Sequence, residues 1–398
     1  MSKLQELIQE LCPNGVEYKK LGNLLVYEQP TNYIVQSTDY DNSYKIPVLT
    51  AGQTFILGYT NEVDGIYTAS PNNPTIIFDD FTTSFHWVDF DFKVKSSAMK
   101  MLRPKETFNG SFKYVYYAMK CIGYEAVDHS RHWISKYSQF EIPFPPLAVQ
   151  EEIVKILDRF AEYAAELQAE LQARQEQYEY YRNKLLTFDK IGGGTQSVTC
   201  MKMSEIFDMR NGYTPSKANA EFWENGTIPW FRMEDIRTNG RILLDSIQHI
   251  TFKAVKGGKL FQANSFIIAT TATIGEHALL IADSLANQRF TNLQVRKSLK
   301  DTVLIKYLYY YMFIVGEWCK NNTNVSGFAS VDMKRFKKLS IPIPPIAEQE
   351  RIVSILDKFE ALVSDLTEGL PAEISAVQEQ YEYYRNRLLS FPKNKISA

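Results

Sequence analysis

The chain has 398 residues, of which 45% are hydrophobic, and this suffices for two or three folded domains with real cores. Its formal net charge of −2 excludes a nucleic-acid binder that is basic all over, yet Lys and Arg outnumber Asp and Glu by 19 to 12 within residues 199–340. Within residues 1–141 the acidic side chains are in excess, by 16 to 13. A cationic surface for phosphates is therefore expected in the later segment, while the earlier one must localise its positive groups or rely on a partner's.

Residues 1–141 are expected to form a loop-rich module of mixed α/β structure. The segment opens with an amphipathic helix pattern over Lys3–Leu11, which differs from a signal peptide. No apolar run in the chain is long enough to cross a bilayer, so we expect a cytoplasmic protein. Alternating or aromatic-rich runs predict strands at Tyr44–Leu49, Thr75–Phe81 and Phe85–Val94, and a helix at about Phe112–Cys121.

A long helix is expected next, starting at Pro145-Pro146, because proline is tolerated in the first turn of a helix. The residues of one face of this helix then follow each other at alternating spacings of four and three, which is the heptad pattern of a coiled-coil seam. The seam is Ile153, Leu157, Phe160, Ala164, Leu167, Leu171, Arg174, Tyr178, Tyr181 and Leu185, with Arg174 as its one polar member. About 40 residues at ~1.5 Å each make a rod of roughly 60 Å. We interpret the following Gly192–Gly194 as a linker.

Residues 199–340 loosely repeat the plan of the first module. IPVLTAGQ from Ile46 corresponds to IPWFRMED from Ile228, TIIFDD to SFIIATT at Ser265–Thr271, and KYVYYAMK from Lys113 to KYLYYYMF from Lys306. The framework is shared and the loops are not. Two modules that read different targets would need such divergence, although drift after duplication also produces it.

The second long helix establishes a tandem duplication. EQYEYYRN occurs at Glu176–Asn183 and again at Glu379–Asn386, and the blocks Ile142–Phe160 and Ile341–Phe359 also match. The EQYEYYRN copies are 203 residues apart and the other blocks 199 apart, so the second copy contains four extra residues, about one helical turn.

The extra residues lie within the second seam, which is Ile352, Leu356, Phe359, Val363, Leu366, Leu370, Ile374, Val377, Tyr381, Tyr384 and Leu388. Two consecutive spacings of four, at Leu366–Leu370–Ile374, form a stutter. Gly369 and Pro371 lie at the same place, which predicts a kink or a short break.

These patterns predict an α+β protein with two loop-rich α/β domains separated by two long antiparallel helices packed as a coiled coil, with a pseudo-two-fold internal repeat. The opening helix is expected to cap the free end of the second rod. The expected boundaries are 1–141 for the first domain, 142–190 for the first helix, 191–198 for the Gly-rich linker, 199–340 for the second domain and 341–398 for the second helix.

The duplicated block IPxPPxxxQ, followed by IVxxLDxF and later by YRNxLL, resembles the DNA specificity subunit of type I restriction–modification systems over the whole chain. The resemblance implies that residues 1–141 and 199–340 are target-recognition domains, each reading one half of a bipartite asymmetric target in double-stranded DNA. The helices would be conserved spacers that set the half-site spacing. The interruption at Gly369–Pro371 and the net-negative first module depart from the usual pattern.

The resemblance also implies a subunit without catalysis or cofactor of its own. Its partners would be two methyltransferase subunits, which carry S-adenosylmethionine and methylate adenine. In the full enzyme, restriction subunits that use ATP with Mg would join them.

Base reading favours Arg on guanine and Asn or Gln on adenine, presented on loops. The candidates in the second domain are Arg210, Asn211, Tyr213, Arg232, Arg237, Asn239, Arg241, Asn287, Gln288, Arg289, Asn321, Asn322 and Asn324. Those in the first are Gln53, Tyr59, Asn61, His86, Arg131, His132, Trp133 and Lys136. A solvated loop residue is the alternative for each. Lys334 opens a basic run before the second rod, where phosphate contact and a solvated face both stay open.

The EQYEYYRN blocks combine packing and polar residues. Tyr178, Tyr181, Tyr381 and Tyr384 belong to the seams. The remaining face is more polar than a buried bundle needs, and we interpret it as a docking surface for the methyltransferase subunits, with a solvated face as the alternative. Its residues are Glu179, Arg182, Asn183, Glu382, Arg385 and Asn386.

Two other classes of function are open on the sequence. Asp91-Phe92-Lys93, with Asp79 and Asp80 upstream, superficially resembles a nuclease metal site, although DFKV also fits a strand with ordinary exposed charges. The second alternative class is a bipartite repressor unrelated to methylation. No metal site is expected, because the four cysteines are scattered and no cysteine accompanies His129 and His132.

Overall fold

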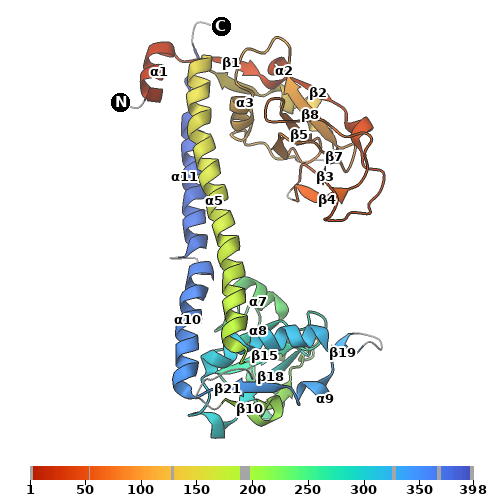
Figure 1. The fold of residues 1–398 in the computed structure, drawn as a ribbon, viewed down its shortest axis with the longest axis vertical. Helices are drawn as coiled ribbons and strands as arrows, with labels where there is room; N and C mark the ends of the chain where they lie inside the picture. The colour runs from red at the N-terminus through yellow and green to blue at the C-terminus, as the bar shows by residue number, and fades with distance from the viewer. Residues whose placement is uncertain are drawn as a thin grey trace. The chain divides into compact units, whose positions relative to one another are not determined.

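The computed structural model describes residues 3–52, 54–126, 130–188, 198–324, 329–364 and 369–394. The chain forms two compact units. The first unit consists of Met1–Gln168 and Glu373–Ala398, and the second of Ala169–Ala372. Each unit holds one α/β domain together with parts of the long helices (Figure 1).

The α/β domain of the first unit contains a four-stranded sheet, β2-β8-β5-β6, and a three-stranded sheet, β4-β3-β7. A ribbon of β1 and β9 joins the two ends of the domain. The strands are β1 (Glu17–Lys20), β2 (Leu25–Glu28), β3 (Ile46–Leu49), β4 (Ile56–Thr60), β5 (Thr75–Asp79), β6 (Phe85–Val88), β7 (Lys93–Val94), β8 (Met99–Pro104) and β9 (Glu141–Phe144). The helices are α1 (Lys3–Leu11), α2 (Leu21–Leu24), α3 (Phe112–Met119) and α4 (His132–Ser135), with 3-10 turns η1 (Pro30–Tyr33) and η2 (Tyr137–Gln139).

One strand expected in this domain is in fact two. The run Phe85–Val94 divides into β6 and β7, which belong to different sheets. Between them the chain leaves the first sheet, and Phe92 forms an antiparallel bridge with Tyr67. The aromatic alternation persists through the crossing because Val88, Phe92 and Val94 are all buried in the same core cluster.

The domain of the second unit contains a five-stranded sheet, β11-β18-β15-β16-β13, a three-stranded sheet, β14-β12-β17, the ribbon β10-β21 and the hairpin β19-β20. The strands are β10 (Thr199–Lys202), β11 (Phe207–Asn211), β12 (Ile228–Phe231), β13 (Ile242–Leu243), β14 (His249–Ile250), β15 (Ser265–Ala269), β16 (His277–Leu280), β17 (Leu285–Ala286), β18 (Phe290–Val295), β19 (Thr323–Asn324), β20 (Ser330–Val331) and β21 (Ser340–Ile343). The helices are α6 (Met203–Ile206), α7 (Met233–Asn239), α8 (Ile305–Asn321) and α9 (Met333–Phe336), with 3-10 turns η3 (Ala220–Phe222), η4 (Phe252–Ala254), η5 (Lys256–Gly258) and η6 (Lys297–Leu299).

The two domains share one topology. The order β2-β8-β5-β6 recurs as β11-β18-β15-β16, and β4-β3-β7 recurs as β14-β12-β17. In both small sheets the central strand has one antiparallel and one parallel neighbour, the parallel pairs being β3 with β7 and β12 with β17. The internal repeat predicted from short sequence matches is therefore present in the strand order of both domains.

The first long helix, α5 (Leu147–Leu186), has the 40 residues expected from the heptad seam and begins directly after Pro145-Pro146. Its seam residues Ile153 and Leu157 are completely buried, and Leu167 and Tyr178 nearly so. Arg174, the polar member, forms an ion pair of 3.3 Å with Glu170 on the same helix.

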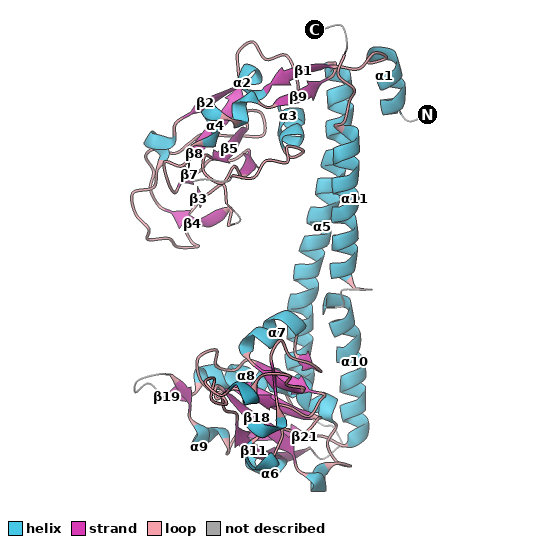
Figure 2. Cartoon of the chain, turned by 180° about the vertical axis from the view of Figure 1, so that it is seen from behind, coloured by secondary structure: helices cyan, strands magenta, loops and turns pink. Residues whose placement is uncertain are grey.

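The second long helix is described as two, α10 (Ile346–Ser364) and α11 (Leu370–Leu388). The predicted kink or break falls on residues 365–368, including Leu366 of the seam, which lie outside the described residues, while Gly369 directly precedes α11. Pro371 occupies the first turn of α11, where a missing N–H leaves no hydrogen bond unmade. In the first unit, α11 lies beside the first half of α5 and runs in the opposite direction (Figures 1 and 2).

Each unit contains the same stacked aromatic contact between its two helices. In the first unit Phe160 of α5 stacks on Tyr384 of α11, with ring centroids 5.5 Å apart. In the second, Tyr181 of α5 stacks on Phe359 of α10, with centroids 5.7 Å apart. Because these pairs occupy equivalent positions of the duplicated sequence, the helix packing repeats as the sheet topology does.

The opening helix α1 packs in the first unit against the end of the second rod, as expected, and also against the start of α5. Leu4 belongs to the same buried cluster as Leu389 near the end of α11. The Lys3 Nζ pairs with the Glu152 carboxylate of α5 at 3.0 Å. The Val16 N–H donates to the carbonyl of Pro392 at 2.9 Å, which ties the segment after α1 to the residues after α11.

Each domain is fastened to its helix by the same set of contacts, which we name the domain clamp. In the first unit Tyr114 donates to the carbonyl of Pro143 at 2.9 Å, and Tyr117 donates to Asp158 of α5 at 2.5 Å. In the second unit Tyr307 donates to Pro342 at 2.7 Å, and Tyr310 donates to Asp357 and, at 2.8 Å, to Glu360 of α10. Lys113 and Lys306 add ion pairs to Asp158 and Asp357 at 4.0 and 3.3 Å. Burial is the main cause that raises the pKa of Tyr117 and Tyr310, so both phenols remain donors.

A buried glutamine completes each domain clamp and gives a stability prediction. Gln349 accepts from the Leu304 N–H at 2.9 Å and donates to the carbonyls of Thr302 and Pro344 at 2.9 and 2.7 Å. We expect Gln349→Ala to lower the free energy of unfolding of the second unit by about 3 to 5 kcal/mol, because three buried backbone groups lose their partner. Calorimetry, with hydrogen exchange at the Leu304 amide, measures this.

The matched control is the equivalent glutamine of the first unit. Gln150 bonds only the Ser111 N–H and the Pro145 carbonyl, so Gln150→Ala is expected to cost less, about 2 to 4 kcal/mol, and to leave the Leu304 amide protected. A loss below about 1 kcal/mol for Gln349→Ala would contradict the role assigned to this side chain.

Candidate nucleic-acid interface

The second domain presents polar side chains where two parallel strands end together. β12 and β17 pair with Trp230 opposite Leu285 and Phe231 opposite Ala286. The residues that follow, Arg232 and Asn287, therefore emerge at one edge of the sheet. Ligands in α/β sheets commonly bind outside the carboxyl ends of parallel strands.

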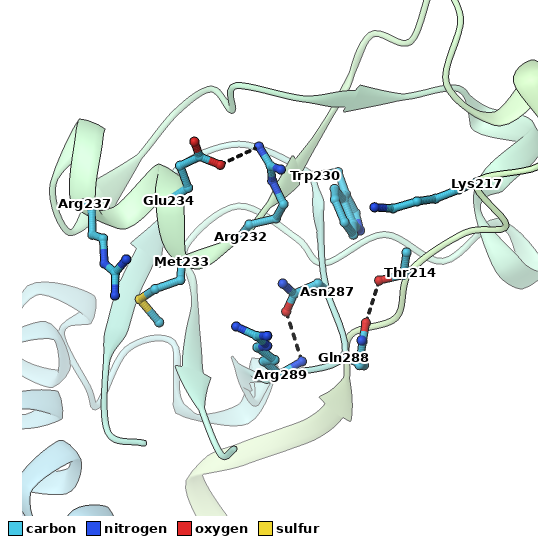
Figure 3. A pocket seen from close by; sticks show the side chains of 10 residues that line it. All are labelled: Thr214, Lys217, Trp230, Arg232, Met233, Glu234, Arg237, Asn287, Gln288 and Arg289. Carbon is cyan, nitrogen blue, oxygen red and sulfur yellow. Dashed lines mark hydrogen bonds and ion pairs between the residues drawn. The ribbon is translucent and has the colours of Figure 1, made fainter. Parts of the chain in front are cut away.

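A cavity of about 590 Å³ opens at this edge, and we name it the strand-end cavity. It brings together five of the residues selected from the sequence, from two separate segments of the chain (Figure 3). The lining is Thr214, Lys217, Trp230, Arg232, Met233, Glu234, Arg237, Asn287, Gln288 and Arg289. Four cationic side chains face one carboxylate in this lining, so the cavity attracts anions such as DNA phosphates.

Hydrogen bonds fix the polar groups of the strand-end cavity. The Arg289 N–H donates to Asn287 Oδ1 at 3.0 Å, and the Thr214 hydroxyl donates to Gln288 Oε1 at 2.5 Å (Figure 3). Arg232 pairs with Glu234 at 3.0 Å and lies over the Trp230 ring, 5.9 Å from its centroid. Asn287, Gln288 and Arg232 are thus held in place before any ligand arrives.

Several other candidates in the second domain support its own fold. Arg241 pairs with Glu276 at 2.7 Å and donates to the His277 carbonyl at 3.0 Å. The Tyr213 hydroxyl donates to the Ala254 carbonyl at 3.0 Å and accepts from the Lys256 N–H at 2.8 Å. In this structure the Arg241 guanidinium and the Tyr213 hydroxyl are therefore occupied inside the domain, and their contact with a base stays a prediction.

The predicted asparagines divide in the same way. Asn321 and Asn322 donate their amides to the carbonyls of Glu317 and Trp318 at 3.0 and 2.8 Å, which closes the last turn of α8. Asn211 accepts from Thr291 at 3.0 Å. Asn239, Asn324 and Lys334 remain exposed, outside the strand-end cavity.

Arg210 lines a second cavity, of about 550 Å³, that the sequence did not reveal as a site. Its guanidinium lies 4.7 Å from the centroid of the Phe261 ring, and burial lowers its pKa. Asn292 and Gln294 on β18 also line this cavity, and Gln294 Oε1 is buried without a hydrogen-bond partner among the described residues. Their alternation with apolar residues made them look like ordinary strand positions.

The first domain places two predicted contacts in its core. His132 and Trp133 are 0% and 2% exposed. The Trp133 ring packs 5.1 Å from Phe78, and the His132 ring bonds the Tyr124 hydroxyl at 3.0 Å. These two predictions are wrong, because the apolar side of α4 faces inward. Neighbouring Arg131 is exposed, and Lys136 lies 5.9 Å from the Tyr124 ring.

The equivalent strand ends of the first domain have a different chemistry. The loop after β3 carries Gly52 and Phe55, and His86 bonds the Gly52 carbonyl at 2.9 Å while stacking on Phe55 at 4.6 Å. Phe90 adds an edge contact to Phe55 at 6.3 Å and is itself exposed. Tyr59 is half-buried on β4 and Asn61 is exposed, whereas Gln53 lies outside the described residues. Lys95 follows β7 at the position equivalent to Asn287, so this edge combines a cation with an aromatic and histidine surface, in place of the four cations of the second domain.

The carboxylates that resembled a nuclease site serve the fold. Asp80 forms a buried ion pair with Lys100 at 3.2 Å, and Asp91 accepts from the Ala69 N–H at 3.1 Å. Lys93 pairs with Glu62 at 2.8 Å. Within the described part of the chain, no three His, Cys, Asp or Glu side chains converge as metal ligands. None of the described helices has the length and apolar character that a membrane crossing requires.

The polar face of the EQYEYYRN blocks differs from the expected one at its arginines. Arg182 is only 8% exposed, and its guanidinium lies 4.2 Å from the Phe313 ring of α8. Arg385 is half-buried and lies 5.5 Å from the Tyr381 ring. The inclusion of Arg182 in a docking surface is therefore wrong, because stacking on Phe313 buries it. Glu179, Asn183, Glu382 and Asn386 are exposed as expected.

Two tyrosines of these blocks that were not selected from the sequence are the most exposed aromatics in them. Tyr180 is 59% exposed and Tyr383 is 57% exposed. Each forms an edge contact with the next tyrosine, with centroids 5.3 Å apart and planes at 76° in both blocks. Their direction follows from the heptad, since they lie one position before the seam residues Tyr181 and Tyr384.

Comparison with known proteins identifies the class to which this fold and this surface belong. The family model of the type I restriction modification DNA specificity domain matches residues 13–177 and again 196–376. The chain belongs to this family, whose members are non-catalytic specificity subunits that direct methylation and restriction to a bipartite target.

Individual relatives match all or most of the chain. It is 46% identical to the specificity subunit of the type I restriction enzyme EcoR124I/EcoR124II of Escherichia coli, over 99% of this chain and 98% of that protein. It is 31% identical to a putative type I specificity subunit of Haemophilus influenzae, over 85% and 86%. Among solved structures, a chain from a study of assembly and conformational transition of the type I system has a TM-score of 0.61 at 18% identity, covering 95% of this chain and 98% of that one. The fold is the same.

Proposed function

We propose that each α/β domain reads one half of the bipartite target, and that the long helices set the number of base pairs between the halves. The observation that supports this proposal is that both domains share one framework but present different side chains at the same edge. Both domains have the same strand order and the same domain clamp, yet the strand-end edge carries four cations and two amides in one, and aromatics, a histidine and Lys95 in the other. Two readers of unlike sequence on one scaffold suit an asymmetric target.

The proposed domain boundaries are 1–141 and 199–340 for the two readers, with 142–190 and 341–398 as spacers and 191–198 as linker. The proposed partners are double-stranded DNA, two methyltransferase subunits that carry S-adenosylmethionine, and restriction subunits that use ATP with Mg. The proposed location of this complex is the cytoplasm.

The proposed docking surface for the methyltransferase subunits is an exposed tyrosine within a polar rim, present once in each unit. It comprises Glu179, Tyr180 and Asn183 in one block, and Glu382, Tyr383 and Asn386 in the other. Exposed tyrosines surrounded by polar groups are typical anchors of protein interfaces. Two equivalent surfaces would accept two copies of one subunit.

Co-expression with the methyltransferase subunit of a type I system tests this function. The unaltered chain should purify with two copies, and methylome sequencing should find methylated adenines in one bipartite motif. Tyr180→Ala with Tyr383→Ala should weaken the complex roughly tenfold or more, because anchor residues dominate interface energy. Each single variant should retain one copy.

The control is Tyr163→Ala, which removes an exposed tyrosine of α5 outside the EQYEYYRN block. It should leave the stoichiometry at two. Failure of the unaltered chain to bind any methyltransferase subunit would contradict the proposed function. An intact complex in the double variant would contradict only the docking surface.

A further inference from the structure

We propose that the second domain reads a guanine in the major groove through Arg289, and that the strand-end cavity is the specificity site for that base pair. This inference rests on the proposed function and assigns one residue and one base to it. The polar atoms around Arg289 differ in whether they already have a hydrogen-bond partner.

The backbone of Arg289 is held from both sides. Its N–H donates to Asn287 Oδ1 at 3.0 Å, and its carbonyl accepts from the Thr270 N–H at 2.9 Å. The side chain itself is exposed, and its guanidinium has no hydrogen bond or ion pair to any residue the structure describes. The fixed backbone leaves only the side-chain rotamers of Arg289 to be ordered when its uncommitted planar donor group binds a base.

The neighbouring side chains make the site rich in donors. Asn287 Oδ1 is occupied by the Arg289 N–H, and Gln288 Oε1 by the Thr214 hydroxyl. The groups left for a ligand are the two amide nitrogens and the guanidinium, none of which has an acceptor among the described residues. Guanine offers two acceptors, N7 and O6, to the major groove, whereas adenine offers one acceptor and one donor. A donor-only edge therefore favours guanine.

The other cations of the cavity suit the phosphates instead. Arg232 is committed to Glu234 and to the Trp230 face. Lys217 carries a point charge without the planar fork that matches guanine. Arg237 lies exposed on the last turn of α7, off the strand end. Phosphate contacts of this kind strengthen binding to every sequence equally.

The test is methylome sequencing of cells that contain the chain, or a variant, together with its methyltransferase subunits. Arg289→Gln should convert one G·C position of the half-site read by the second domain into a preference for A·T, because glutamine pairs with adenine N6 and N7. Discrimination for guanine at that position should fall roughly ten- to hundredfold. All other positions, and the other half-site, should keep their identity.

Arg237→Gln is the matched control, since it removes the same charge from the same cavity. It should lower DNA occupancy at all sites and weaken the salt dependence, without changing the motif. An unchanged motif in Arg289→Gln, or an equal loss at every sequence with the complex still assembled, would overturn the inference and make Arg289 a phosphate contact. The proposed function is judged separately, by whether replacing the whole second domain changes a half-site.

Discussion

Replacing residues 199–340 by the corresponding domain of another specificity subunit should change one half-site completely and leave the other untouched. The reason is that the strand-end cavity and the second cavity both belong to this domain alone, while the aromatic and histidine surface stays on the first. Methylome sequencing of the chimera, beside the parent, measures the outcome. The gap between half-sites should also remain, because the long helices are unaltered.

The domain clamp specifies how that chimera must be joined. The incoming domain has to supply tyrosines equivalent to Tyr307 and Tyr310, which bond Pro342 and Asp357 of the retained segment. A chimera with both tyrosines changed to phenylalanine is the control, and it should lose assembly or stability without acquiring a new motif. Simultaneous change of both half-sites in the intact chimera would contradict the division of labour between the domains.

Removal of residues 366–369 should alter the gap between the half-sites and leave both half-sites unchanged. The deletion removes the four-residue excess of the second helix and restores the seam spacing of the first. Four helical residues correspond to ~6 Å, and DNA rises ~3.4 Å per base pair, so we expect a change of about one or two base pairs. Methylome sequencing reports the gap directly.

Replacing the same four residues with four others of high helix propensity is the control for this deletion. It preserves length while changing sequence, and the gap should stay as in the parent. If the deletion variant methylates the parental motif with the parental gap, the helices do not act as the ruler.

Much of the fold was predictable because its signals repeat. The heptad spacing of α5 and the matched blocks around Pro145-Pro146 predicted the long helices, and Gly369 with Pro371 marked the place where α11 starts. Helix geometry and periodic burial depend on residues that are close in the sequence, so they produce a pattern that can be recognised there. The parallel pairing of β12 with β17 is non-local, and no local pattern announces it.

The candidate site was predictable only in part for the same reason. Arg232, Arg237 and Asn287–Arg289 were selected by residue type, and the structure brings them to one cavity. His132, Trp133, Arg182 and Arg241 were selected by the same criterion, but tertiary contacts bury them or commit their polar groups. Whether an arginine faces solvent or stacks on a ring such as Phe313 depends on residues more than 100 positions away. Residue type alone carries no such information.

The domain clamp also limits how new specificities arise during evolution. Recombination can exchange the loops and strand ends freely, but the incoming block must bring tyrosines placed like those of α3 or α8, because a recombinant without them loses the bonds to the carbonyl and carboxylate of the retained segment. Selection would then remove the recombinant before its DNA preference was ever expressed. Inherited blocks should therefore end beyond the clamp helices, so that each acquired reader arrives with its own means of attachment.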